Sequence, residues 1–145
     1  MSDRAYTVRI AEWPTDAAAI RQVRECVFIE EQRIPAELEW DDLDSQCIHV
    51  LAAVENRDVV GTARLEPTGK IGRVAVLKPR RKQGIGTVMV RQLVAEARRA
   101  GYAELYLHAQ VDALHFYKNL GFYPEGARFD EAGIPHRKMR FDSEI

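Results

Sequence analysis

The 145-residue chain lacks the marks of several protein classes. It has only two cysteines, Cys26 and Cys47, which are too few for a disulfide scaffold, and no C-x-x-C pair for a metal or redox site. No apolar run approaches the roughly 20 residues that span a bilayer, and the first ten residues hold no apolar signal-peptide core. We therefore predict a cytoplasmic protein with no membrane partner and with two reduced, buried thiols.

Metal-ligand spacing is also missing. The four histidines show no H-E-x-x-H or similar pattern, so the sequence predicts no metal. The formal net charge of -1 argues against a dedicated nucleic-acid binder. Apolar residues make up 46% of the chain, which excludes a disordered protein, and the length fits one domain over residues 1–145.

Two short segments depart strongly from the balanced total charge. Residues 30–44 hold seven acids and one base, whereas residues 78–82, KPRRK, hold four bases and no acid. The pair suggests two ligands, one cationic and one anionic. Two solvated loops are the alternative interpretation.

The predicted elements alternate between strands and helices. Apolar patterns predict strands over residues 6–10, 48–54, 59–65, 69–77, 105–107, 123–129 and 137–141. Helical spacing predicts helices over residues 16–28, 84–101 and 112–119, with an acidic loop over 32–46. The strand, helix and strand between residues 69 and 107 predict a βαβ unit with parallel outer strands, in a mixed α/β sheet with helices on both faces.

The junction between the buried strand 74–77 and the helix after it predicts a phosphate site. The first amides of a helix have no partner within the helix, and the helix dipole adds about half a positive charge there. Gly84 and Gly86 allow a ligand to approach the backbone closely, and Arg81 and Lys82 supply counter-charge. The amides of residues 82–87 are therefore expected to hold a phosphate or pyrophosphate. Neither a Walker loop nor a Rossmann fingerprint fits, because the lysine and the third glycine are absent.

Two motifs resemble those of the GNAT N-acetyltransferase family. Arg81-x-x-Gly84-x-Gly86 matches the R/Q-x-x-G-x-G/A motif, and the segment 113–122, ALHFYKNLGF, is similar to the A-x-x-F-Y-x-x-x-G-F segment. The motifs lie about 30 residues apart, and the resemblance extends over roughly residues 5–141. Further residues resemble the ElaA/YjcF-like branch: Arg24, the stretch 27–32, Pro35, Glu39, Asp41, Asp44, His49 and the segments 107–110 and 132–136.

This resemblance implies a twisted, mostly antiparallel sheet of about six to seven strands with a central parallel pair, and acetyl-CoA as cosubstrate. The strand that precedes the phosphate loop would splay from its parallel neighbour, and the pantetheine arm would enter the gap. The implied cofactor-binding residues are Val74, Ala75, Val76, Arg81, Lys82, Gln83, Gly84, Ile85, Gly86 and Thr87. Tyr117 matches the position that protonates the departing CoA thiolate in such enzymes.

The acceptor would be a primary amine of a small molecule or peptide that attacks acetyl-CoA directly in a ternary complex. An amine with a pKa of about 10.4 must lose a proton before it attacks. His108 is the candidate base or substrate-side group nearest the expected reaction centre. Glu31, Glu66, His49 and His136 are candidate substrate-binding residues. We also expect the acidic loop 32–46 to attract a cationic acceptor, because it holds no base beyond Arg33.

Other functions compete with this hypothesis. A non-catalytic CoA or acyl-CoA-binding module would keep the phosphate loop without turnover. A nucleic-acid-binding domain would use Arg80, Arg81 and Lys82, but the acidic segment argues against it. The fold is compatible with a homodimer, and the sequence does not identify the amine.

Overall fold

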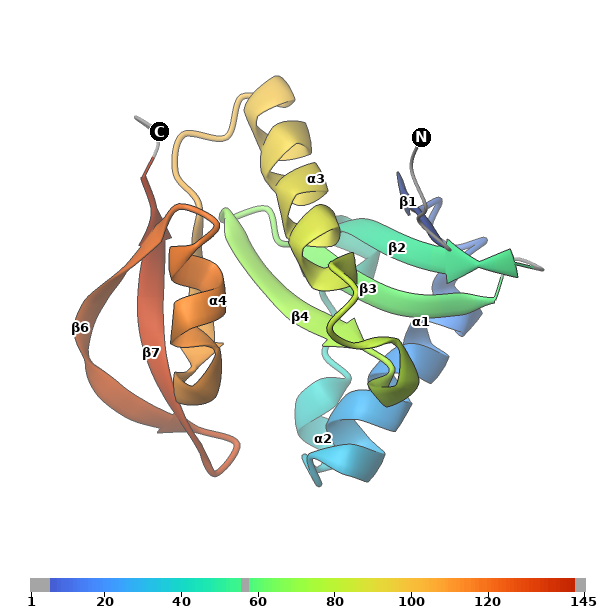
Figure 1. The fold of residues 1–145 in the computed structure, drawn as a ribbon, viewed down its shortest axis with the longest axis horizontal. Helices are drawn as coiled ribbons and strands as arrows, with labels where there is room; N and C mark the ends of the chain where they lie inside the picture. Colours follow the sequence, from blue (N-terminus) through green and yellow to red (C-terminus); the bar gives the residue numbers. More distant parts are fainter. Residues whose placement is uncertain (1–5, 56–57, 143–145) are drawn as a thin grey trace.

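The computed structural model describes residues 6–55 and 58–142. Seven strands form one sheet in the order β1-β2-β3-β4-β5-β7-β6 (Figure 1). Their bounds are β1 Tyr6–Ile10, β2 Ile48–Val54, β3 Val59–Leu65, β4 Lys70–Val76, β5 Tyr106–Gln110, β6 Phe122–Glu131 and β7 Ile134–Phe141. The expected hairpin of β2 and β3 is confirmed, although residues 56–57 of its turn lie outside the described residues.

Only one neighbouring pair in this sheet is parallel, as the βαβ pattern predicts. Lys70 pairs with Tyr106, and Ile71 pairs with Leu107. All other neighbours are antiparallel. The predicted fold class, a mixed and mostly antiparallel sheet with a central parallel pair, is therefore confirmed.

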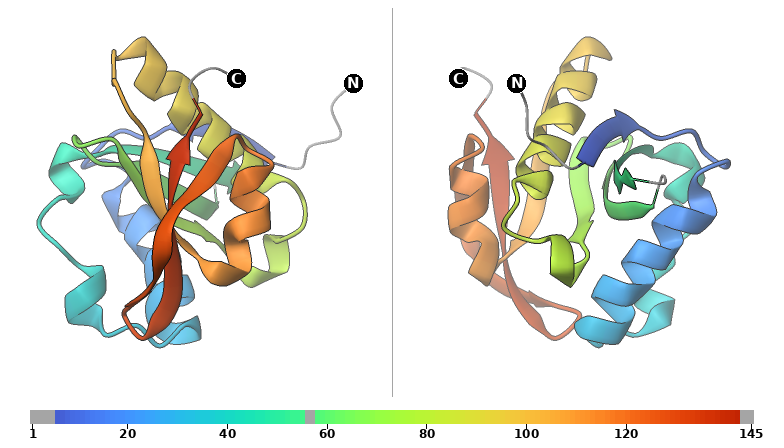
Figure 2. Two further views of the ribbon diagram at one scale, coloured as in Figure 1. Left: turned by 90° about the vertical axis from the view of Figure 1, so that its left-hand side faces the viewer. Right: turned by 45° about the vertical axis from the view of Figure 1, so that its right-hand side comes forward.

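Helices cover both faces of the sheet (Figure 2). Their bounds are α1 Ala17–Arg24, α2 Ala36–Glu39, α3 Ile85–Arg99 and α4 Leu114–Lys118. A π-helical segment, η1 (Glu25–Glu31), continues α1 without a break, and short 3₁₀ turns lie at 44–46, 78–80 and 111–113. The segment 32–46 is thus not wholly a loop, because it contains α2 and one of these turns.

The main core lies between the sheet and α3. The α3 stripe of Ile85, Met89, Leu93 and Ala97 is at most 1% exposed and packs with Val50, Leu65, Ile71, Leu107 and Met139. Burying each large apolar side chain contributes about 1.5–3 kcal/mol. On the opposite face, Val23, Val27 and Phe28 pack on Ala75 of β4. β4 is therefore held by helices from both sides.

β4 and β5 are joined at their beginnings and separate toward their ends (Figure 1). The Tyr106 amide donates to the Gly69 carbonyl at 3.1 Å, and any Cβ at Gly69 would overlap the Glu104 carbonyl. Beyond Ile71 and Leu107 the two strands no longer pair. Arg73, with a positive φ of 51°, lies at an irregularity in the β3–β4 register. The chain thus opens a gap in the middle of the sheet.

Candidate functional site

The loop from β4 to α3 presents unpaired amides, as predicted for an anion site. Lys82 and Gly84 both have positive φ, of 64° and 86°. The first described bond into α3 runs from the Val88 amide to the Gly84 carbonyl, so the amides of 85–87 have no protein acceptor within residues 6–55 and 58–142. Successive free amides at a left-handed turn and a helix N-terminus form a concave anion site.

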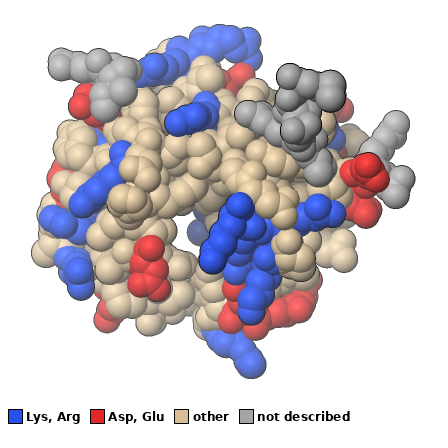
Figure 3. Space-filling model, in the orientation of Figure 1, with Lys and Arg blue, Asp and Glu red and all other residues tan. Residues whose placement is uncertain are grey.

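A groove of about 420 Å³ lies beside this loop. Its lining consists of Val74, Val76, Arg80, Arg81, Lys82, Gly84, Ile85, Gly86, Thr87 and Phe116. Figure 3 shows a hollow near the middle of this face, with Lys and Arg side chains gathered over the loop between β4 and α3. Eight of the ten predicted cofactor residues therefore line one surface.

The other two predicted cofactor residues take different positions. The Ala75 side chain is 2% exposed and packs against the α1 side of the sheet. Gln83 lies in the loop, where its carbonyl accepts from the Tyr6 hydroxyl at 3.4 Å. Gly86 also has a packing role, because a Cβ there would lie 3.2 Å from the Phe116 ring.

Arg81 is engaged with protein groups. Its guanidinium donates to both Glu31 carboxylate oxygens, at 2.6 and 2.7 Å, and to the Val76 carbonyl at 2.8 Å. The hydrogen bond from Arg81 lowers the pKa of Glu31. Both side chains are about one-third exposed, so an anion would still meet this charge at the surface. Glu31 thus joins the end of η1 to the phosphate loop and does not line the acceptor-side pocket described next.

A second cavity, of about 180 Å³, lies at the gap between β4 and β5. It shares Val74 with the groove. Its polar and charged lining residues are Gln32, Glu39, Glu66, Lys70, Arg73, His108, Gln110, Tyr117, Glu131 and His136. We call this cavity the acceptor-side pocket. Gln110 on β5 donates to the Gln32 side chain at 2.9 Å and so joins β5 to the end of η1.

Tyr117, the candidate proton donor of the sequence analysis, lies on α4 where the two cavities meet. It lines the acceptor-side pocket, whereas its neighbour Phe116 lines the groove. Tyr117 is 9% exposed, and burial raises its pKa above the usual range. Its hydroxyl has no hydrogen-bond partner in the described part of the chain, and the Phe116 and Phe122 rings contact its ring edge-on. A neutral phenol with a free O–H can donate a proton to an anion formed beside it.

His108 and His136 also line the acceptor-side pocket, together with Glu131. His108 Nδ1 lies 3.0 Å from Glu131 Oε1, and His136 Nε2 lies 3.7 Å from Glu131 Oε2. Glu66 lines the opposite wall and lies 3.6 Å from Arg64. Of the predicted substrate-side residues, His108, His136 and Glu66 are therefore brought together.

His49 lies elsewhere, which corrects the expectation that it contacts substrate. It is 2% exposed, stacks on Trp13 with ring centroids 4.3 Å apart, and its Nε2 lies 2.8 Å from the Asp44 carbonyl. Burial lowers its pKa. A neutral imidazole that fills this space explains the residue without a ligand.

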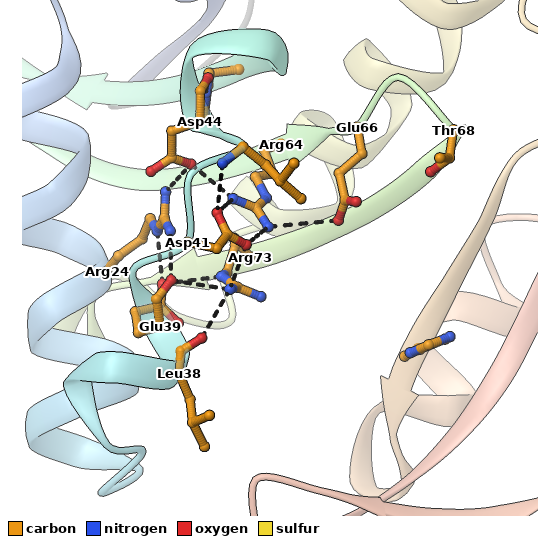
Figure 4. A network of polar contacts seen from close by, with 12 residues as sticks. Arg24, Leu38, Glu39, Asp41, Asp44, Arg64, Glu66, Thr68 and Arg73 are labelled. Atoms are coloured by element: carbon orange, nitrogen blue, oxygen red, sulfur yellow. Dashed lines mark hydrogen bonds and ion pairs between the residues drawn. The ribbon is translucent and has the colours of Figure 1, made fainter.

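The expected cation-attracting role of the acidic loop is wrong for its principal acids (Figure 4). Arg24 of α1 bonds Glu39 and Asp44 at 2.7 Å, and Arg64 of β3 bonds Asp41 and Asp44 at 2.6–2.9 Å. Arg73 of β4 lies 3.3 Å from both Glu39 and Asp41. The neutralising bases thus come from other elements of the fold. We call these six residues the arginine–carboxylate network.

Most of this network is buried, and each of its charges has a partner of opposite sign, although Arg64 Nε and Arg73 Nε have no hydrogen-bond acceptor among the described residues. Arg24 and Arg64 are 1–2% exposed. Burial opposes the charge of Asp44, yet hydrogen bonds from Arg24 and Arg64 outweigh it and lower the pKa of this carboxyl. The bond from Arg64 likewise lowers the pKa of Asp41, whereas burial raises the pKa of Glu39. The network attaches the acidic segment to α1 and the sheet and so fixes one wall of the acceptor-side pocket.

The sequence analysis did not predict five residues that line the acceptor-side pocket: Gln32, Lys70, Arg73, Gln110 and Glu131. Glu131 follows an alternating strand and precedes Ala132-Gly133, which is a hairpin-turn signal, so its position at a strand end was readable. The contact between Glu131 and His108 could not be predicted from the sequence, because the two residues are 23 positions apart and lie on strands separated by β7.

Within residues 6–55 and 58–142 no cluster of three His, Cys, Asp or Glu side chains could hold a metal ion. In the same residues, no helix has the length and hydropathy of a membrane span.

Comparisons with known proteins agree with this geometry. A family model described as an acetyltransferase (GNAT) domain matches residues 18–143. Bacillus subtilis YjcF, described as an uncharacterized N-acetyltransferase, is 36% identical over 124 residues, which cover 83% of this chain and 88% of YjcF. Escherichia coli protein ElaA is 34% identical over 130 residues, which cover 83% and 84% of the two chains.

Two crystal structures extend the likeness to the fold. An acyl-CoA N-acyltransferase from Pseudomonas aeruginosa superposes with a TM-score of 0.81 at 28% identity, over 94% of this chain and 98% of that one. ElaA from Escherichia coli gives a TM-score of 0.78 at 25% identity, over 94% and 99% of the two chains. These relatives include both members after which the ElaA/YjcF-like branch is called.

Proposed function

Because the chain belongs to the GNAT family of acetyltransferases, we propose that it transfers an acetyl group from acetyl-CoA to a primary amine of a small molecule or peptide. The observation that carries this proposal is the meeting of two cavities at Val74. One cavity ends at a loop whose free amides and basic side chains suit a phosphate, and the other contains a phenol, imidazoles and carboxylates. A transferase that joins two substrates needs two such openings onto one point.

The cofactor-side residues fit acetyl-CoA. The free amides of 85–87, with Arg80 and Lys82 beside them, would hold the pyrophosphate. Beyond Ile71, the β4 edge that faces β5 has no strand partner, so its backbone groups before Val76, whose carbonyl accepts from Arg81, could pair with an amide-bearing arm. Acetyl-CoA would supply the thioester carbonyl that the amine attacks.

Tyr117 and His108 then divide the proton transfers. His108 takes one proton from the acceptor ammonium and passes it to water, which leaves a neutral amine to form the C–N bond. Tyr117 gives its phenolic proton to the sulfur as the C–S bond breaks, and it regains a proton from the nitrogen that becomes the amide. The ammonium thus loses two protons, one to solvent and one, through Tyr117, to the thiol.

Thiol release from acetyl-CoA in the presence of an amine panel tests this proposal. We expect amine-dependent release with the wild type and a matching N-acetyl product by mass spectrometry. Calorimetric binding of CoA without amine-dependent release across the panel would instead indicate a CoA-binding module. Absence of CoA binding would contradict the assignment of the groove.

A further inference from the structure

The tip of the β6–β7 hairpin brings a carboxylate to the acceptor-side pocket. Glu131 pairs with Ile134 across the two-residue turn Ala132-Gly133, whose φ angles are 54° and 77°. Such a turn, with both central residues at positive φ, fixes the register of the strands that it joins. Glu131 therefore lies at a defined place on the pocket wall, and it is 44% exposed.

The contact between Glu131 and His108 sets the tautomer of the imidazole. Glu131 Oε1 lies 3.0 Å from His108 Nδ1, and an ionised carboxylate only accepts, so Nδ1 carries a proton. In the neutral ring Nε2 then keeps its lone pair. Nε2 has no partner among the described residues, and the Phe129 ring meets the imidazole edge-on at 5.1 Å. The ring is held with one basic nitrogen free in the pocket.

The second oxygen of Glu131 is left open to the pocket. His136 Nδ1 lies 2.7 Å from the Ile134 carbonyl and donates to it, so Nε2 of the neutral ring carries no proton. This nitrogen lies 3.7 Å from Glu131 Oε2, too far for a hydrogen bond. Oε2 can therefore accept an N–H from an ammonium ligand without displacing a protein donor.

The charges around the pocket keep Glu131 ionised. Burial opposes its charge, but the hydrogen bond from His108 and the positive charge of Lys70 on β4 outweigh burial and lower the pKa of Glu131. The other ionisable groups that line the pocket are Glu39, Glu66, Arg73, Tyr117 and His136, and Lys138 of β7 lies opposite His108 in the sheet. A carboxylate fixed on Nδ1 stabilises the imidazolium that forms when Nε2 accepts a proton.

From this arrangement we propose that Glu131 is a positioning residue for His108 and a contact for a cationic acceptor. Oε1 orients the imidazole and stabilises its protonated form. Because Nδ1 and Nε2 point to opposite sides of the ring, Oε2 accepts an N–H from a second cationic group of the acceptor, separate from the ammonium that gives its proton to Nε2. This inference rests on the proposed function, because it assigns the acceptor side of that same reaction. No redox change or further co-reactant is involved.

The decisive variant is Glu131→Gln, which keeps the shape and removes the charge. We expect kcat/KM for the amine to fall about 10- to 100-fold, whereas the KM for acetyl-CoA stays unchanged. The acidic limb of the pH profile of kcat/KM should move to lower pH, because the protonated imidazole loses its counter-charge. Glu131→Asp should recover part of the loss. Wild-type kcat/KM and an unmoved acidic limb in Glu131→Gln would overturn the proposal.

A matched control is available on the same strand. Glu125 of β6 is 43% exposed, pairs with Arg140 at 2.7 Å and does not line the pocket. Glu125→Gln should leave kcat/KM and its pH profile unchanged. An equal loss in both variants would indicate a general effect of charge on β6 and would also overturn the proposal.

A measurement without substrate separates this inference from the proposed function. Side-chain NMR of the histidines, titrated from pH 5 to 8, should show His108 titrating at lower pH in Glu131→Gln than in the wild type. Glu125→Gln should not move it. If the wild type acetylates no amine, the proposed function fails, yet an unchanged His108 titration would still overturn the Glu131 contact by itself.

Discussion

The two cavities that meet at Val74 are built in different ways. The groove beside α3 is formed mainly by backbone: two left-handed residues, the free amides of a helix start and an unpaired strand edge. The acceptor-side pocket is formed by residues of η1, α2, β4, β5, α4, β6 and β7, together with Glu66 from the turn after β3. A local segment can thus encode the first cavity, whereas the second exists only when distant strands are assembled.

The same contrast applies to charge. Near the phosphate loop, Arg80 and Lys82 have no protein anion within the described residues, so they remain available to a ligand. On the acceptor side, three acids of the segment 32–46 form ion pairs with Arg24, Arg64 and Arg73. These acids are Glu39, Asp41 and Asp44. The basic run lines a surface groove, whereas the acidic run is largely part of the internal structure.

The largest expected effect comes from breaking the network behind the acceptor-side pocket. Asp44→Ala leaves the buried Arg24 and Arg64 without a shared partner and should lower the free energy of unfolding by about 3–5 kcal/mol. Urea denaturation measures this loss. Asp42→Ala, at an exposed position of the same segment, is the control and should change stability by less than about 0.5 kcal/mol. Equal midpoints for the two variants would show that the network contributes little.

Acid should weaken the same network. The folded-state pKa values of Asp41 and Asp44 lie below the ordinary value of 3.8, so their stabilisation is complete above about pH 4 and is lost as the pH falls through the lowered values. Urea midpoints measured between pH 6 and pH 2 should therefore fall most steeply below pH 4. In Asp44→Asn this fall should be smaller, and an identical pH dependence would contradict the assignment.

The next largest effect is expected from removing the Tyr117 hydroxyl, which lies where the two cavities meet. Tyr117→Phe should lower kcat by about 10²-fold, since the departing thiolate loses its proton donor. Stability and acetyl-CoA affinity should persist, because this hydroxyl has no hydrogen-bond partner in the described part of the chain. Tyr123→Phe, at an exposed residue of β6, is the control. Turnover at the wild-type rate in Tyr117→Phe would mean that solvent or another group protonates the sulfur.

A smaller change should affect the groove alone. Gly84→Ala forces a side chain into a left-handed conformation, which costs about 1–2 kcal/mol and should weaken CoA binding about 10-fold if the loop relaxes. Gly101, at the other end of α3, has a φ of 85° and open space where a Cβ would lie, so Gly101→Ala carries the same strain away from the site. Calorimetry should show weakened binding only for Gly84→Ala.

The smallest expected effect concerns the ion pair between Glu31 at the end of η1 and Arg81 in the loop from β4 to α3. Glu31→Gln removes the negative charge that faces Arg81 and should tighten CoA binding about two- to threefold at low salt, with less gain at high salt. Calorimetry at two ionic strengths measures it. Weaker binding in this variant would show that the ion pair itself holds the phosphate loop in shape.

Much of the fold could be predicted from local pattern. Period-two strands, the α3 stripe and the hairpin of β2 and β3 follow from side-chain periodicity, and the order strand, helix, strand predicted the parallel pair. The predicted helix over 16–28 covers α1 and the first part of η1. The π-helical geometry of η1, its end at Glu31 and the short helix α2 were not predicted, because they depend on packing against β4 and on the partners of Glu39.

The sequence by itself predicted the loop from β4 to α3 and its free amides, because a helix start and two glycines within a few residues shape the backbone locally. The partner of Arg81 in this loop, Glu31, is 50 positions away and was not predicted. The sequence also located Tyr117, through a motif in one short helix. Only the tertiary structure decided which charges are free. Glu39, Asp41 and Asp44 are neutralised by arginines 15 to 34 positions away, and His49 is buried beside Trp13. Burial and pairing depend on contacts between strands and helices, so the same acidic residues that suggest a cation site in the sequence become internal supports of the pocket wall.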